Sequence, residues 1–282
     1  MALSLFNKRK PDQPEMTFID HLEELRWHIV RSILAIIIAA ILIFIKLDWV
    51  FDHVILGPVQ NDFISYRALC SFSHWVGMGD SLCLPPIPPG YSLLATTVGG
   101  PLMSAIKIGL MGGLIFAFPY IFWEVWRFIK PALSPTELKY SRNSLFWVSL
   151  CFFLGAAFGY FILGPFTFNF LANFTLGTTN MYEYKPTLDD YLNSLLDLML
   201  GCAIAFELPI VTYVLTKIGL VTPSFLRTYR KYAYVVILIV AAIITPSPDW
   251  TSQLIVTLPL ALLYELSIII SVRVYKRQQK WN

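Results

Sequence analysis

The carboxylates are the side chains of this sequence whose positions could do chemistry, and Glu207 is the most unusual of them. It lies in the segment CAIAFELPI, residues 202–210, inside a long apolar run, and Pro209 follows two residues later. A charged side chain in the middle of a membrane span costs about 2.5–3.5 kcal/mol on insertion scales. The sequence therefore raises the question of what such a group contributes there.

Glu207 has a structural and a functional interpretation. In the first, burial keeps the carboxyl protonated, and it donates to the carbonyl of Ala205, which Pro209 leaves without its helical donor. In the second, Glu207 is a polar contact on the wall of a cavity or groove, where it meets a partner. The general rule for ionisable groups inside spans favours the second interpretation.

Two other carboxylates in apolar surroundings are interpreted structurally. Glu265, in the segment LLYELS, lies near the end of an apolar run and could reach the membrane interface. Glu124, in FWEVWRF, has Arg127 three residues later, and this spacing predicts an ion pair on one helix face.

Sequence motifs for catalysis are absent. The chain contains no GxSxG, no HExxH and no glycine-rich phosphate loop. The four histidines show no metal-site spacing, and a surface or interfacial role is favoured over ligation for the two that share one predicted helix, His21 and His28. We therefore predict that the protein is not an enzyme and has neither cofactor nor metal.

The elements that position these residues are membrane spans. The chain is 56% hydrophobic and only 14% charged, its mean hydropathy is +0.63, and soluble domains carry roughly 25% charged residues. A helix needs about 20 apolar residues to cross a bilayer, and the runs are too long and unalternating for barrel strands. The sequence predicts six spans, near residues 28–47, 96–128, 143–171, 191–216, 231–246 and 252–272, of which the fifth is short.

Lysine and arginine orient these spans. With six spans, the N-terminus, residues 128–142, residues 217–231 and the C-terminus lie on one side. That side holds all of the 21 basic residues except four, Lys46, Arg67, Lys107 and Lys185. Cytoplasmic loops carry such an excess, so both termini are predicted to be cytoplasmic.

Glu23, Glu24 and Glu137 are the carboxylates of interest on this basic side. Glu23 can pair with Arg26 three residues later, whereas Glu24 has no such obvious local partner. Glu137 follows Ser134 with the spacing of a helix cap. Because a guanidinium fork matches a carboxylate bidentately, carboxylates gathered on this face are what recognition of an arginine pair would need.

The chain divides into a membrane domain and polar ends. We expect a disordered tail over residues 1–15, a six-span domain over 16–272 and a basic tail over 273–282. The longest outer loop, residues 48–95, contains CLPPIPPGY, which cannot form a helix and should form a rigid cap. Cys70 and Cys83 lie in this loop, and a disulfide between them is an open alternative if that compartment is oxidising.

Four segments give the sequence a family resemblance. They are FIDHLEELRWHI before the first span, VWRFIKPALSPTE after the second, AFELPI in the fourth, and TPSPDWTSQ with PLALLYE across the fifth and sixth. With these segments in order over residues 16–272, the chain resembles the TatC family, the multispanning receptor of the twin-arginine (Tat) protein translocase.

The resemblance implies a fold and a function. The fold is an all-α integral membrane protein with six transmembrane helices in a curved, cup- or glove-like wall, with short spans five and six. The function is Sec-independent translocation of folded proteins across the bacterial inner membrane, with recognition of twin-arginine signal peptides at the cytoplasmic face. The implied partners are single-span TatA and, in some systems, TatB, together with further copies of the chain and lipid, but no nucleic acid; the proton-motive force drives transport.

The resemblance also assigns residues by position. It places signal-peptide binding at Glu24, Arg26, Phe128, Pro131 and Glu137. It places the intramembrane polar contact at Glu207, and it matches family residues of the outer loops at Pro58, Asp249 and Gln253.

The sequence departs from the family pattern in three places. Its first outer loop is longer than usual around Cys70 and Cys83, and TPSPD is one residue longer than the usual turn, which loosens the match at Asp249. Glu124 stands where an uncharged glutamine is common, and it adds a carboxylate near the predicted recognition surface.

Two functions of other classes remain as alternatives. One is a small-solute transporter or proton-coupled channel, with Glu207 and Lys107 in the pathway. The other is an intramembrane enzyme, for which the sequence offers no nucleophile–base pair. The cytoplasmic glutamates Glu24 and Glu137 distinguish the receptor from both, because a solute pathway has no need of them.

Overall fold

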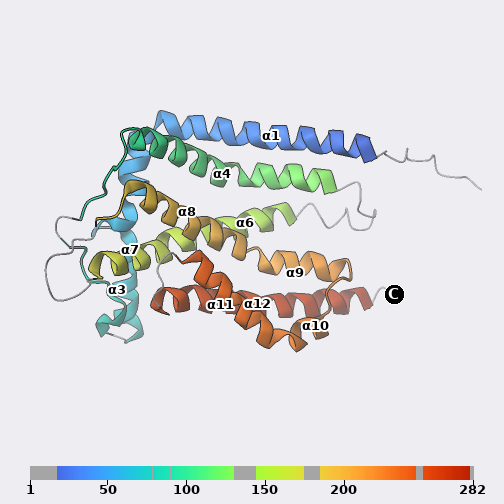
Figure 1. Ribbon diagram of the computed structural model, residues 1–282. Coiled ribbons are helices and arrows are strands. Elements are labelled where there is room, and N and C mark those ends of the chain that lie inside the picture. The colour runs from blue at the N-terminus through green and yellow to red at the C-terminus, as the bar shows by residue number, and fades with distance from the viewer. Residues whose placement is uncertain are drawn as a thin grey trace, which may run out of the picture.

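Most helices lie side by side and form the body of the protein, and α3 (Ile64–Val76) and α7 (Gly164–Asn173) lie at one end (Figure 1). The computed structural model describes residues 18–77, 79–88, 91–129, 144–174, 185–245 and 250–279. The helices of the body include α1 (Phe18–Ile45), α4 (Gly100–Ile129), α6 (Ser144–Phe158), α8 (Leu188–Ala205), α9 (Leu208–Lys217), α11 (Arg230–Ile244) and α12 (Trp250–Gln279). The other α-helices of the described residues are α2 (Leu47–Val50), α3 (Ile64–Val76), α7 (Gly164–Asn173) and α10 (Pro223–Thr228).

Five segments of the described chain are long and apolar enough to cross a membrane. They are Leu22–Ile45, Gly100–Ile129, Leu145–Asn173, Leu188–Lys217 and Ser252–Arg277. They coincide with five of the six predicted spans, so hydropathy located them correctly. The start of α1 and the end of α12 lie at the same end of the helix layer (Figure 1).

The last two predicted spans differ in length. Helix α11 has 15 residues, a rise of about 22 Å, and agrees with the predicted short fifth span. The sixth predicted span, 252–272, lies within α12, which has 30 residues and continues past the end of the prediction. Lys276 and Arg277 lie in its last turn, and such good helix formers extend it past its apolar part.

Glycines let two pairs of helices approach closely. A Cβ at Gly113 of α4 would lie 2.8 Å from the carbonyl oxygen of Ile36 and 2.9 Å from the amide nitrogen of Ala40, both on α1. A Cβ at Gly159 would lie 2.5 Å from the carbonyl oxygen of Leu198 on α8. These positions admit glycine alone without movement of a backbone, and the first brings α1 and α4 together along their length.

The fourth span is broken where the sequence places Pro209. Helix α8 ends at Ala205, a turn contains Phe206 and Glu207, and α9 begins at Leu208. Pro209 occupies the first turn of α9, where its missing N–H costs nothing. The predicted bend is therefore a full interruption of the helix, with Glu207 in it.

Polar side chains join α11 and α9 to α12. Glu265 on α12 accepts from Arg230 and, at 2.5 Å, from the hydroxyl of Tyr234, both on α11. The buried hydroxyls of Thr216 on α9 and Ser271 on α12 lie 2.9 Å apart. The structural interpretation of Glu265 is thus supported, because this carboxylate ties two helices together.

Tyrosine hydroxyls fasten the cap segment that follows α2. Tyr160 and Tyr191 donate to the carbonyls of Val54 and Ile55, at 2.6 and 2.5 Å. Tyr66 of α3 donates to the carbonyl of Pro58 at 3.1 Å, and burial raises the pKa of Tyr66 to about 12. Pro58 itself is buried in a short 3-10 turn, Gly57–Val59. This residue, which the family resemblance had assigned to the outer loop, therefore belongs to the contacts between the cap and the spans.

Cys70 and Cys83 are joined in a disulfide, with Cα atoms 4.4 Å apart. The bond links α3 to the 3-10 turn Gly79–Leu82 and the residues after it. Residues 83–88 have no regular secondary structure, in keeping with their proline content. The disulfide and the tyrosine bonds hold the described part of the loop against the helices.

Candidate functional site

Four side chains from α1 and α4 form a connected polar cluster near the start of α1. The hydroxyl of Tyr120 donates to Oε1 of Glu124 at 2.8 Å. The other oxygen of Glu124 lies 2.5 Å from Nδ1 of His28, and Nε2 of His28 lies 3.9 Å from Oε1 of Glu24. We call Glu24, His28, Tyr120 and Glu124 the carboxylate–histidine cluster.

Burial makes this cluster unusual for the end of a helix pair. The side chains of His28 and Glu124 are 7% and 1% exposed, and that of Glu24 is 34% exposed. Buried ionisable groups are tolerated when paired, which the contact between His28 and Glu124 satisfies. Oε2 of Glu24, by contrast, is buried and has no hydrogen-bond partner among the described residues. Glu24 therefore has one acceptor that no described residue fills.

The Glu124 contact corrects the predicted pair with Arg127. Glu124 is directed at α1, where His28 lies, whereas the guanidinium of Arg127 lies 5.8 Å from the ring centre of Trp123. The i,i+3 spacing was real, but packing of α4 against α1 turned the carboxylate inward. The unusual carboxylate thus belongs to the cluster.

Two further predicted residues flank the cluster. The ring of Phe128 meets the imidazole of His28 edge-on, with centroids 6.0 Å apart. The guanidinium of Arg26 lies 3.4 Å from Glu23, as predicted, and both side chains are exposed. Glu24, Phe128 and Arg26 are therefore gathered at one end of the α1–α4 pair.

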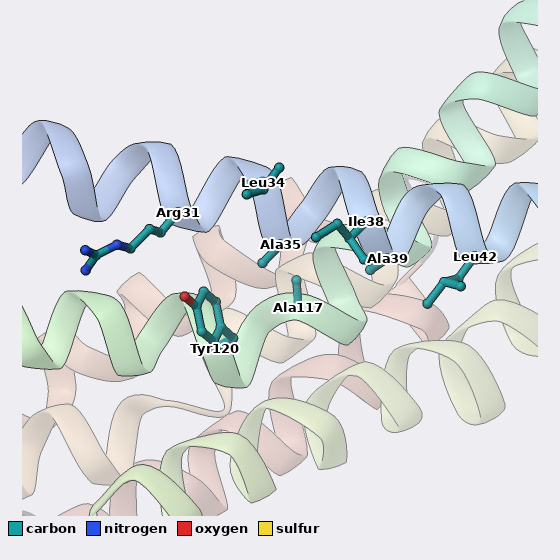
Figure 2. Close-up of a pocket in the computed structure, with 8 residues that line it drawn as sticks. All are labelled: Arg31, Leu34, Ala35, Ile38, Ala39, Leu42, Ala117 and Tyr120. Carbon is teal, nitrogen blue, oxygen red and sulfur yellow. The ribbon is translucent and has the colours of Figure 1, made fainter.

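An apolar groove of about 350 Å³ runs between α1 and α4 from this end (Figure 2). Arg31 and Tyr120 lie at one end of it and Leu42 at the other, with Ala35, Ala39 and Ala117 between the two helices (Figure 2). Tyr120 belongs both to the groove and to the carboxylate–histidine cluster. The groove therefore continues from the polar cluster along the apolar part of the helix pair.

Glu207 lies apart from this cluster, in the break between α8 and α9. It is partly buried, and its Oε1 has no hydrogen-bond partner among the described residues. The proposed local bond to the carbonyl of Ala205 is thus not formed. The role of Glu207 as a polar contact for a partner stays a prediction.

Lys107 has a structural explanation that weakens the solute-pathway alternative. Its amine contacts the carboxylate of Asp189, and it donates to Oδ1 of Asn193 at 2.8 Å. Both partners belong to the first turns of α8, so the lysine ties α4 to α8 near the cap. A lysine paired in this way fixes two helices together, which accounts for its position without a solute pathway.

The remaining assigned residues are only partly placed. Pro131, Glu137 and Asp249 lie outside the described residues. Gln253 is on α12, and its amide donates to the carbonyl of Leu238 on α11 at 3.2 Å. Gln253 thereby joins two helices near the last outer turn.

Sequence reasoning missed three residues. His28 was assigned a surface or interfacial role and is buried, although its spacing of four from Glu24 on a helix was a readable signal. Tyr120, one turn before Glu124, carried the same kind of signal. Asp197 is a third omission, because this carboxylate is exposed on α8 within the fourth span, and ionisable residues in spans are functional candidates by default.

The cap brings together the residues that could hold a metal ion. Ligand atoms of Cys70, His74, Asp80 and Cys83 all lie within 4.8 Å of one another, a proximity that sequence spacing did not suggest. The two sulfurs are bonded to each other, and zinc binds cysteine as thiolate. His74 instead pairs with Asp80 at 3.2 Å. The four residues therefore form a turn that is closed by a disulfide and an ion pair.

Comparison with known proteins decides the family. Residues 20–259 match the family described as Sec-independent protein translocase protein (TatC). The chain belongs to the TatC family. It is 37% identical to a Sec-independent protein translocase protein TatC of Blattabacterium sp. subsp. Periplaneta americana over 285 residues, covering 95% of this chain and 100% of that one. It is 34% identical to the Aquifex aeolicus protein of the same description, covering 90% and 94%.

Solved structures agree with the assignment. A crystal structure of the twin-arginine translocase receptor TatC matches with a TM-score of 0.64 at 34% identity, covering 90% of this chain and 99% of that one. A second TatC crystal structure, obtained in the detergent DDM, gives a TM-score of 0.67. Membership of the TatC family confirms the predicted resemblance and the all-α fold. It also confirms that the chain is a multi-pass membrane protein with a role in Tat protein translocation. TatC proteins are translocase components and not a family of catalytic enzymes.

Proposed function

We propose that this TatC-family chain recognises twin-arginine signal peptides at the cytoplasmic face of the inner membrane. Glu24 carries the proposal, because one of its carboxylate oxygens is buried without a partner among the described residues. An arginine guanidinium offers five donors in a planar fork and stays charged at every relevant pH. A single guanidinium can therefore fill the acceptor that the helices leave open.

Glu137 supplies the second carboxylate in this proposal. Two arginines of one signal would then pair with Glu24 and Glu137, with Phe128 and Pro131 beside them and Arg26 at the edge. A hydrogen bond to a charged group is worth about 1.5–3 kcal/mol. Loss of either carboxylate should thus impair binding much more than loss of an exposed ion pair.

The apolar part of the signal lies along the helix wall, and the groove between α1 and α4 is the segment we assign to it. Its lining from Leu34 to Leu42 is apolar apart from backbone. It begins at Tyr120, which donates to Glu124 in the carboxylate–histidine cluster. A peptide that enters with its arginines at Glu24 can therefore continue into the groove without a turn.

Translocation further requires partners and an orientation. We propose that α11 completes a set of six spans, that both termini are cytoplasmic, and that TatA, and TatB where present, assemble with this chain and with its copies. Glu207, in the break of the fourth span, provides a polar contact for a partner helix or for the inserted signal. The proton-motive force drives the transport step.

Site-specific photocrosslinking of the full-length chain in membranes tests the proposal. A photoreactive residue at position 24 or 137 should crosslink to a twin-arginine signal peptide, and the product should disappear when both arginines of the peptide are changed to lysine. A probe at position 23, whose side chain is exposed, is the matched control and should crosslink weakly. Crosslinks that ignore the arginines, or that favour position 23, would overturn the assignment.

A further inference from the structure

His28 lies between two carboxylates and contacts each with a different ring nitrogen. Nδ1 is 2.5 Å from Glu124, and Nε2 faces Glu24 at 3.9 Å. Glu124 is almost wholly buried, and Tyr120 already occupies its other oxygen. The Nδ1 proton of His28 is therefore directed at Glu124, which fixes the orientation of the ring.

The fixed ring leaves Nε2 as the variable atom of the cluster. When Nε2 carries a proton, the imidazolium points its second N–H and its positive charge toward Glu24. When Nε2 carries no proton, its lone pair faces the carboxylate of Glu24 and provides neither a hydrogen-bond donor nor a positive charge. One proton on one nitrogen thus decides whether Glu24 already has a cationic neighbour.

We propose that His28 is a positioning residue that competes, when protonated, with a signal arginine for Glu24, so that binding of the signal releases a proton from Nε2. This inference rests on the recognition role proposed for Glu24. An arginine beside Glu24 would place a fixed positive charge next to the imidazolium, and like charges disfavour each other. The bound state therefore favours neutral His28.

The charged and titratable groups around His28 come from two helices. Glu24 and Arg31 belong to its own helix, and Tyr120, Glu124, Arg127 and Phe128 come from α4. Arg31 and Arg127 keep their charge throughout the relevant pH range, and the Phe128 ring, edge-on to the imidazole, does not titrate. Histidine is the side chain whose ordinary titration falls between about pH 5 and pH 8.

The sign of the pH dependence follows from linkage. Binding that releases a proton becomes tighter as pH rises, and the limit for one proton is about tenfold in affinity per pH unit. The affinity for the signal should therefore rise with pH. It should stop rising at high pH, where the free protein has no Nε2 proton left to release.

Binding of a fluorescent twin-arginine peptide to the full-length chain in lipid nanodiscs tests this inference. The peptide is acetylated and contains no histidine, and anisotropy gives its affinity between about pH 5.5 and pH 8. The wild-type chain should bind more tightly at high pH. His28→Gln should lose the slope, and His28→Lys, whose ammonium group would face Glu24 and Glu124, should bind the peptide more weakly than His28→Gln.

Two controls separate the possible failures. His21→Gln removes the other imidazole at this end of the chain and should keep the slope; a slope that survives in His28→Gln, or disappears in His21→Gln, overturns the inference. Glu24→Gln tests the proposed function itself, which fails if that variant binds like the wild type. If the His28 variants do not fold, ¹⁵N NMR of the wild-type imidazole provides the test. At fixed pH, addition of the peptide should remove the Nε2 proton of His28. An unchanged imidazole signal would count against the inference.

Discussion

The imidazole of His28 lies 2.5 Å from the carboxylate of Glu124, although the two residues are separated by 96 positions and belong to different helices. The contact joins α1 to α4 inside the apolar part of the protein. It also links the charge of Glu24 to a residue that is buried beneath it. The stability of the helix pair and the chemistry of its exposed end thus depend on the same pair of side chains.

A double-mutant cycle measures this pair. Removing one partner of a buried ion pair costs about 3–5 kcal/mol, because the other group is left unpaired. His28→Leu and Glu124→Leu should each lower the temperature at which the purified protein loses monodispersity in detergent. The double variant should lose less than the sum of the two, and strictly additive losses would show that the two groups do not interact.

Gly113 should tolerate no side chain, because α1 backbone atoms occupy the space. Gly113→Ala would place a methyl group 2.8 Å from a carbonyl oxygen of α1 and should lower the same thermal transition. The neighbouring Gly112→Ala is the matched control, since its methyl group meets only the end of the Ile43 side chain, which can move. Equal stability of the two variants would contradict the close helix approach.

Glu207 should matter for export more than for folding. Its buried Oε1 has no hydrogen-bond partner among the described residues, so Glu207→Leu removes a group that costs about 1–3 kcal/mol when unsatisfied. The variant should be at least as stable as the wild type, yet export of a twin-arginine substrate should fall. A marked loss of stability in detergent would show instead that Glu207 is bonded within the chain.

The cap should respond to reduction. The disulfide closes a loop between residues 13 positions apart, and loops of this size gain about 3 kcal/mol from closure. Reductant, or Cys70→Ser with Cys83→Ser, should increase protease cleavage between α3 and α4 and leave the spans intact. Mass mapping under non-reducing conditions should recover residues 70 and 83 in one crosslinked peptide, and separate free-thiol peptides would disprove the bond.

Hydropathy predicted most of the fold, because lipid leaves few choices for a chain of this composition. A backbone in the bilayer must satisfy its own hydrogen bonds, so each long apolar run becomes a helix. The break at Glu207 was likewise readable from Pro209. The length of α12 was not, because its end is set by helix-forming residues beyond the apolar part.

The candidate site was only partly readable. Glu24 and its neighbour Arg26 were identified from short motifs, and the spacing of Glu24 from His28 was a local signal. The partner of Glu124 was not accessible from sequence spacing. Arg127 is closer to Glu124 in the chain. The packing of α4 against α1, which involves contacts such as that of Gly113, directs the Glu124 side chain toward His28 instead.

The affinity of a twin-arginine signal peptide for the chain in nanodiscs tests the central claim most directly. Glu24→Gln should weaken binding about tenfold to about a hundredfold, the equivalent of roughly 1.5–3 kcal/mol for a hydrogen bond to a charged group. Glu23→Gln, one residue away but exposed, should change it by about twofold or less. Equal affinities for the wild type and Glu24→Gln at about pH 8, where a neutral His28 does not compete, would contradict the assignment of Glu24 as the arginine-binding carboxylate.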